Sequence, residues 1–307
     1  MKIRMGIDVG GTKANMGLLT DEGEIIARHK LMMPRGAQPE AQMKLIAEAA
    51  KKLVGDSGHA MEDLLFVGMG VPGTVDETNT IVLNCPNLGW INVHAAEQFY
   101  ALCGIRPLVA QDSRASALGE YLCGSGKNAK ALVSVTLGTG IGGGIILNGK
   151  IFHGALGTAG EIGHIPVVTN GRLCGCGRYG CVEAYGSGTG IARNADEHPA
   201  FKGQHLPSER IFELAESGNA DALEVISDCV EKLGRGLCAV INVLSPDAMI
   251  FSGGLCAQRK LYVDPLIKFI RTHAYGLACN ERLKLDVSIL GADAPMIGAA
   301  MLDKALH

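Results

Sequence analysis

Apolar and polar positions along the first quarter of the chain predict a sheet packed against a helix. Two alternating stretches on either side of Gly10-Gly11 indicate a β-hairpin, and a third strand follows the turn "DEG". A stretch with helical period and then a short apolar run come next, as expected for a helix beside a buried strand. We expect strands at residues 3–9, 14–20, 24–32 and 64–73 and a helix at 39–54.

The stretch 131–154 repeats this order. It reads strand, Gly-Thr-Gly turn, strand, turn, strand, so the second half of the chain replays the first. A module that occurs twice in a chain of 307 residues suits two domains of roughly 150 residues each. The other elements are expected as helices at 91–104, 113–124, 219–244, 261–274 and 294–307 and strands at 107–112, 246–255 and 284–291.

Charge and composition narrow the class of partner. With 28 basic and 31 acidic residues, no net field would attract nucleic acid or a membrane surface, so we expect a small-molecule partner. The 42 glycines gather beside short apolar runs, which favours close approach of backbone to a ligand. We see no apolar segment typical of a signal peptide or membrane span, and most of the ten cysteines stand alone, which predicts a cytoplasmic protein.

The turn "DVGGTK" has the composition of a phosphate-binding loop. Gly10 and Gly11 let backbone N–H groups approach phosphate oxygens, to which Thr12 and Lys13 can also donate. Asp8 can hold a hydrated Mg²⁺ ion that bridges phosphates. The spacing matches neither the P-loop nor the dinucleotide fingerprint, and a plain hairpin turn is the alternative.

A second turn, "LGTGIGGG" at 137–144, has the same chemistry. Strand signals continue after Gly142, so the helix that a dinucleotide site requires is missing and a second phosphate loop remains. The pair Gly253-Gly254 follows another strand. Two such turns in equivalent positions of a repeat are hard to explain as turns alone.

The segment "LCGCGRYGCVE" places three cysteines within eight residues. Their spacing is not that of a CxxC redox pair, and three thiolates leave a tetrahedral zinc site one ligand short. His164 lies ten residues before Cys174, although a lone upstream histidine is more often an ordinary residue than a ligand. The glycines between the cysteines favour a metal knuckle, because tight turns point the thiolates inward.

Asp112 stands between an expected short strand and an expected helix. A carboxylate there can take a hydroxyl proton during phosphoryl transfer, or it can cap the helix, and its position alone supports the two roles equally.

These motifs occur together in a known order. "GIDVGGTK", "GVPGTVD", "PNLGW", "LGTGIGGG", "GEIGH", "CGCGRYGCVE" and "FSGG" resemble the ROK family of sugar kinases, within the actin and hexokinase superfamily, from Ile7 to the last helix. The resemblance implies a two-lobed actin-like α/β fold (ribonuclease H-like), with mixed sheets, flanking helices and a zinc knuckle. It implies an N-terminal lobe of residues 1–112, completed by the helix 294–307, and a C-terminal lobe of residues 113–293.

The resemblance also implies roles for particular residues. Those for the ATP phosphates and Mg²⁺ are Asp8, Gly10, Gly11, Thr12, Lys13, Gly138, Thr139, Gly140 and Gly142, and those for adenosine are Gly253 and Gly254. The implied sugar contacts are Asn87, Gln111, Glu161, His164 and Glu183. The implied ligands of a structural Zn²⁺ are His164, Cys174, Cys176 and Cys181. Asp112 is then the general base at the 6-hydroxyl of a hexose.

Two positions depart from the family pattern, which usually has asparagine at both. Gln111 precedes the expected base and Arg114 follows it by two residues, so glucose, fructose, mannose, allose and an N-acetylhexosamine all stay open as the hexose. A non-catalytic sugar-responsive regulator of the same family is the other alternative. It would need a DNA-binding segment before the first turn, where only seven residues precede Asp8. Relatives are often dimers or tetramers, which predicts a homodimer or homotetramer.

Overall fold

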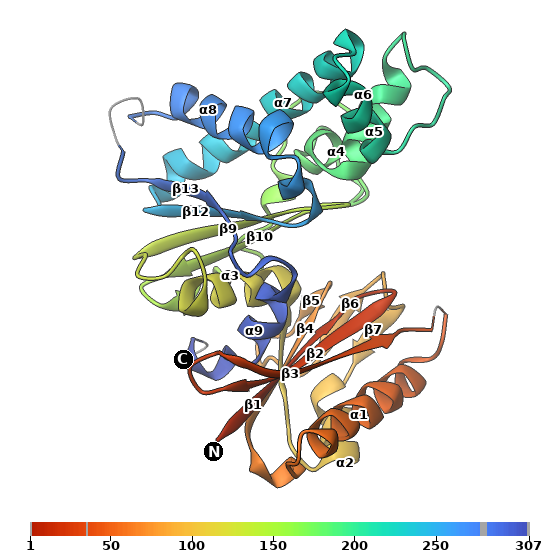
Figure 1. Cartoon of the computed structure of the whole chain (residues 1–307), viewed down its shortest axis with the longest axis vertical. Coiled ribbons are helices and arrows are strands. Elements are labelled where there is room, and N and C mark those ends of the chain that lie inside the picture. The colour runs from red at the N-terminus through yellow and green to blue at the C-terminus, as the bar shows by residue number, and fades with distance from the viewer. Residues whose placement is uncertain (1, 35, 277–280, 306–307) are drawn as a thin grey trace. The chain divides into compact units, whose positions relative to one another are not determined.

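The computed structural model describes residues 2–34, 36–276 and 281–305, and its internal contacts divide the chain into two units (Figure 1). The first unit consists of Met1–Lys130, Gly144–Ala159 and Ser288–His307, and the second of Ala131–Gly143 and Gly160–Val287. Each unit has its own buried apolar core.

The first unit is built on a five-stranded sheet in the order β3-β2-β1-β4-β8. Its strands are β1 (Ile3–Val9), β2 (Lys13–Thr20), β3 (Ile25–Met32), β4 (Leu64–Val71) and β8 (Leu108–Gln111). β1 and β2 form the expected antiparallel hairpin, whereas β1, β4 and β8 run parallel. The carboxyl ends of these three parallel strands therefore meet at one edge of the sheet.

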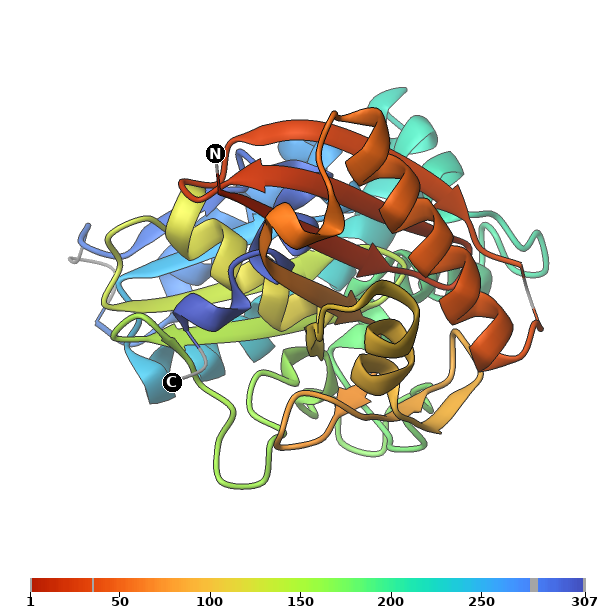
Figure 2. The ribbon, with the colours of Figure 1, turned by 90° about the horizontal axis from the view of Figure 1, so that it is seen from below.

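Helices cover both faces of this sheet. α1 (Pro39–Asp56) and α2 (Ala95–Cys103) share a core with the odd-numbered residues of β1, and Figure 2 shows α1 lying along the sheet. α3 (Asp112–Cys123) packs against the short α9 (Ala294–Ala299), which lies on the other face. Glycine allows α9 to lie close to the sheet, because a Cβ at Gly6 in β1 would lie 1.9 Å from the carbonyl oxygen of Met296 in α9.

The second five-stranded sheet has the order β11-β10-β9-β12-β13, which repeats the strand order of the first. Its strands are β9 (Ala131–Leu137), β10 (Ile141–Leu147), β11 (Lys150–Ile151), β12 (Ala248–Ser252) and β13 (Lys284–Val287). The repeat predicted from the glycine turns is therefore confirmed at the level of topology. The helices of the second unit are α4 (Glu183–Gly186), α5 (Gly188–Glu197), α6 (Ser208–Glu216), α7 (Ala220–Leu244) and α8 (Asp264–His273).

Three expectations need correction. The helix expected at 91–104 begins only at Ala95, because Trp90–Val93 forms a strand of a small sheet made of β5 (Thr74–Val75), β6 (Val82–Cys85) and β7 (Trp90–Val93). The last helix ends at Ala299, and a 3-10 turn continues its buried apolar spacing, while residues 306 and 307 lie outside the described part. The lobe boundary expected after residue 112 falls inside the first unit, because α3 packs on α9.

Within the described residues, none of the helices combines the length and apolar character that crossing a bilayer requires.

Candidate functional site

The hairpin turn between β1 and β2 carries the first group of expected phosphate residues. The Gly10 N–H donates to the carbonyl oxygen of Lys13 at 2.8 Å, and Thr12 and Lys13 are exposed. A Cβ at Gly11 would lie 2.9 Å from the carbonyl oxygen of Asn87, so glycine allows a close approach there. The turn and the expected sugar contact Asn87 are thus neighbours within the first unit.

Asp8 stands near the end of β1, beside this turn. One of its carboxylate oxygens accepts a hydrogen bond from Asn15 Nδ2 at 3.2 Å. Burial raises the pKa of Asp8, although the Asn15 hydrogen bond and the Lys13 charge oppose the rise. A half-buried carboxylate with few hydrogen bonds has oxygen lone pairs left for a hard cation such as Mg²⁺.

Asp112 is the first residue of α3 and follows β8 directly, so Gln111 occupies the N-cap position. The Asp112 Oδ1 atom accepts a hydrogen bond from the Ser113 N–H at 2.6 Å. Asp8 pairs with Gly70 in the β1–β4 register, and a Cβ at Gly70 would lie 3.6 Å from the Asp112 Cα. Asp8 and Asp112 therefore occupy the same sheet edge. Burial raises the pKa of Cys85 to about 11, and the charge of Asp112 adds to that rise.

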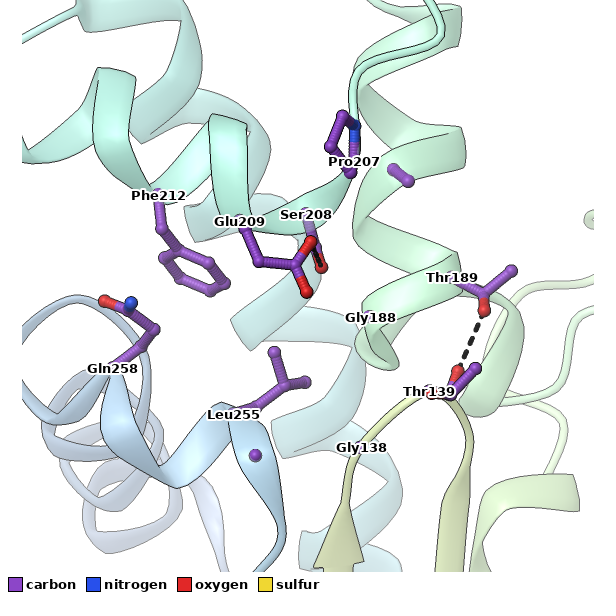
Figure 3. Close-up of a pocket in the computed structure, with 12 residues that line it drawn as sticks. Gly138, Thr139, Gly188, Thr189, Pro207, Ser208, Glu209, Phe212, Leu255 and Gln258 are labelled. Carbon is purple, nitrogen blue, oxygen red and sulfur yellow. Dashed lines mark hydrogen bonds between the residues drawn. The ribbon is translucent and has the colours of Figure 1, made fainter. Parts of the chain in front are cut away.

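The turn between β9 and β10 carries the second group. The Gly138 N–H donates to the Gly140 carbonyl oxygen at 3.0 Å, and α5 begins against this turn. The Gly188 N–H donates to the Gly138 carbonyl oxygen at 2.8 Å. The Thr189 hydroxyl donates to the Thr139 carbonyl oxygen at 2.9 Å, and Figure 3 shows this second bond as a dashed line. Gly142 lies within β10 itself.

A cavity of about 550 Å³ opens beside this turn, entirely within the second unit (Figure 3). Three of the expected nucleotide residues line it, namely Gly138, Thr139 and Gly254. Gly253 acts differently: its φ is +94°, and a Cβ there would lie 2.4 Å from the Leu137 carbonyl oxygen, so it permits close backbone packing. The remaining lining residues are Gly188, Thr189, Ala192, Pro207, Ser208, Glu209, Phe212, Leu255 and Gln258.

Those remaining residues were not found from the sequence, because α5 and α6 carry no recognisable motif. The sequence around α5 carries only signals for a helix. Ser187 caps α5 by accepting the Gly190 N–H, and Ile191 and Ala195 keep a helical period on its buried side. That pattern predicts the helix but says nothing about a cavity.

The three clustered cysteines and His164 come together in the second unit. Their four ligand atoms all lie within 4.8 Å of one another. Cys174 Sγ is 3.8 Å from His164 Nδ1, and Cys176 Sγ is 3.7 Å from Cys181 Sγ. Zinc–sulfur bonds of about 2.3 Å in a tetrahedron give edges of about 3.8 Å. The donor set and its spacing therefore fit a zinc ion.

The three thiols differ in acidity. Burial raises the pKa of Cys174 to about 12 and also raises that of Cys181. Burial opposes ionisation of Cys176 too, but hydrogen bonds from the Arg178 N–H and from the other two thiols outweigh it and lower the Cys176 pKa. Gly180 shapes this loop, since its φ is +76° and a Cβ there would lie 1.9 Å from the Val168 carbonyl oxygen.

Glu183 connects the cysteine cluster to the glycine turn. Its Oε2 atom accepts a hydrogen bond from the Ile141 N–H at 2.9 Å, and its Oε1 atom accepts one from Cys174 Sγ at 3.7 Å. Glu161 is exposed and precedes the 3-10 turn that ends at His164, whose N–H donates to the Glu161 carbonyl oxygen at 3.1 Å. Glu161, His164 and Glu183 thus all belong to the second unit, whereas Asn87 and Gln111 belong to the first.

The chain is similar in sequence and structure to several known proteins. A family model described as the ROK family matches residues 4–305. A glucokinase of Halalkalibacterium halodurans is 33% identical over an alignment of 315 positions, which covers 98% of this chain and 94% of that protein. A ROK family glucokinase from Streptomyces griseus, crystallised with glucose and AMPPNP, has a TM-score of 0.82 at 32% identity, with 98% of both chains covered. A xylose repressor of Caldicellulosiruptor bescii is 27% identical over an alignment of 304 positions, which covers 96% of this chain and 76% of that protein.

Proposed function

This chain belongs to the ROK family, and on that premise we propose that it is an ATP-dependent kinase that phosphorylates a hexose at its 6-hydroxyl. One observation carries the proposal. Asp112 lies at the same sheet edge as Asp8 and the Gly10–Lys13 turn, so a carboxylate suited to accept a proton accompanies groups suited to phosphate. The glucokinase relative and the glucokinase complex with AMPPNP support the same activity.

The chemistry divides among the described groups. Phosphoryl transfer needs a positioned acceptor and stabilisation of charge on the phosphate oxygens. We assign the proton of the attacking hydroxyl to Asp112, and we assign contacts with the phosphates to the two glycine turns. Asp8 would hold Mg²⁺, which when bound neutralises charge on the phosphates. The adenosine would lie in the cavity lined by Phe212 and Leu255.

The proposed sugar contacts are the ones that membership of the ROK family implies. We assign them to Asn87, Gln111, Glu161, His164 and Glu183. A structural zinc ion, held by His164 and the three clustered cysteines, would fix the loop in which Cys174 touches Glu183. His164 points Nδ1 at Cys174, which leaves Nε2 for a sugar hydroxyl.

The identity of the hexose is the finer part of the proposal. Glucose is favoured by the glucokinase relatives, and Gln111 and Arg114 leave the other hexoses as alternatives. A regulator without catalytic activity is the second candidate, which the similarity to a xylose repressor supports. Assembly as a homodimer or homotetramer and a cytoplasmic location stay predictions.

Coupled measurement of ADP release over a panel of hexoses tests the proposal. We expect turnover with at least one hexose, and Asp112→Asn should lower kcat by about 10²- to 10⁴-fold because the proton acceptor is lost. Asp221→Asn is the matched control, since Asp221 stands in the first turn of α7 and should change kcat little. Turnover with no hexose, or equal kcat in Asp112→Asn and the unmodified protein, would contradict the proposal.

A further inference from the structure

We propose that Arg114 is a positioning residue that anchors the segment His153–Ala159 and thereby sets the affinity for the sugar. This inference rests on the proposed sugar kinase function. It gives a role to Arg114, which is one of the two departures from the family pattern named above and has arginine where asparagine is usual.

Arg114 is buried inside the first unit. It is the third residue of α3, with 7% of its surface exposed. Its Nη2 atom donates to the carbonyl oxygens of Gly157 at 2.5 Å and Ala159 at 3.2 Å, and its Nη1 atom lies 3.2 Å from His153 Nδ1. One guanidinium therefore contacts both ends and the middle of a seven-residue segment.

Every residue of the segment is exposed or half-buried. Gly154 and Gly157 have φ values of +68°, so the backbone turns sharply twice. The Ala159 N–H donates to the His153 carbonyl oxygen at 3.0 Å, which closes the segment into a loop. Leu156 is 87% exposed, so apolar burial contributes little at the tip of the loop.

The contact with His153 fixes the form of that imidazole. A guanidinium only donates, so Nδ1 must accept and the ring must be neutral with its proton on Nε2. Burial lowers the pKa of His153, and the charge of Arg114 lowers it further, which favours the neutral ring. A bidentate, planar donor suits two carbonyl oxygens and an imidazole at once, which a lysine ammonium on a flexible stem would match poorly.

The anchored segment leads directly to a proposed sugar contact. Only Gly160, with a φ of +93°, stands between Ala159 and Glu161. Arg114 itself lies two residues after Asp112 on the same helical turn. Since its guanidinium is directed to the segment, it acts on the sugar through the position of Glu161.

Steady-state kinetics of Arg114→Met, Arg114→Lys and Arg4→Met test the inference. Arg4 is the matched control, because it is 4% exposed in the same unit, donates to the Ala300 carbonyl oxygen and pairs with Asp21 and Asp303. We expect Arg114→Met to raise the KM for the sugar about tenfold or more, with kcat and the KM for ATP nearly unchanged, and Arg114→Lys to lie between. Arg4→Met should lower Tm and leave the sugar KM unchanged.

Hydrogen exchange of the proteins without ligand supplies a second readout. The Ala159 N–H should exchange faster in Arg114→Met and at the original rate in Arg4→Met. An unchanged sugar KM in a folded Arg114 variant, or an equal rise in Arg4→Met, would overturn the inference. If the unmodified protein phosphorylates no hexose, the proposed function fails by itself, and unchanged exchange at Ala159 then overturns the anchoring by Arg114. Should Arg114→Met not fold, Arg114→Lys decides by the same two measurements.

Discussion

A single carboxylate, that of Glu183, contacts both the cysteine cluster and the turn between β9 and β10. Its two oxygens have separate partners, the Ile141 N–H and the Cys174 thiol. Movement of the turn or of the cluster would therefore move the carboxylate. This coupling could not be predicted from the sequence, because Gly140 and Glu183 are 43 residues apart and neither the turn nor the cysteine motif indicates that the two lie close together in the fold.

Gly140→Ala should disturb this carboxylate selectively. A Cβ at Gly140 would lie 2.5 Å from Glu183 Oε2, and because that atom ends a flexible side chain, the carboxylate should shift while the fold stays intact. We expect a sugar KM raised about tenfold and a nearly unchanged Tm. In Gly175→Ala the new Cβ meets no atom within 4 Å, so its kinetics should match those of the unmodified protein. Equal sugar KM values for the two variants would refute the coupling.

Between elements, the backbones of α3 and α9 approach each other closely. A Cβ at Gly298 would lie 1.7 Å from the Ala115 carbonyl oxygen, and one at Gly119 would lie 2.4 Å from that of Ala294. Backbone meets backbone at both points, so neither helix can give way by a change of rotamer. Glycine at these two positions therefore allows α3, whose first residue is Asp112, to lie where it does.

Gly298→Ala should consequently destabilise the protein. Overpacking of this kind costs about 1–3 kcal/mol, and thermal unfolding followed by circular dichroism should show a lower Tm. Gly55→Ala is the control, because Gly55 lies in α1 with open space around its Cβ position and alanine there gains up to about 1 kcal/mol in helix propensity. A Tm for Gly298→Ala equal to or above that of Gly55→Ala would contradict this account.

At the same scale, the strands were more predictable than the short helices. Alternation and glycine turns identified β1, β2, β9 and β10, and the doubling of the module. The predicted helix at 91–104 wrongly includes the last three residues of the strand Trp90–Val93, because this strand depends on pairing with β6 and on the Trp90 Nε1 hydrogen bond to Gln42, both of which are tertiary. For the same reason the cavity walls contributed by α5 and α6 were not foreseen.

On the scale of the whole molecule, the expected site residues fall into two separate sets. The hairpin turn, Asn87 and Asp112 belong to the first unit, and the cavity and the cysteine cluster belong to the second. Sequence motifs predicted the two glycine turns, Asn87, Asp112 and the cysteine cluster, since their chemistry is carried by short stretches of chain. The other residues that line the cavity come from elements far apart in the sequence, and no motif predicts them.

Removal of the proposed zinc ion should therefore act on one unit. We expect a strong chelator, or Cys176→Ser, to abolish sugar binding measured by calorimetry and to speed hydrogen exchange at Ile162–Glu183, while exchange in the first unit and most secondary structure persist. Cys123→Ser is the control, because that thiol lies in α3 of the first unit, outside the cluster. Full sugar binding by protein shown to be free of metal would refute a zinc site of this kind.

The ion pairs of Arg4 also bear on the order in which the protein becomes structured during synthesis. Arg4 pairs with Asp303, and α9 covers the sheet that contains β1, so the first sheet depends on residues that follow the second unit in the sequence. In a chain of residues 1–287, the part of the first sheet that α9 covers would be exposed. The strands and helices of the second unit would already be complete. The second unit can thus finish folding before the first unit, the reverse of the usual direction from the N-terminus.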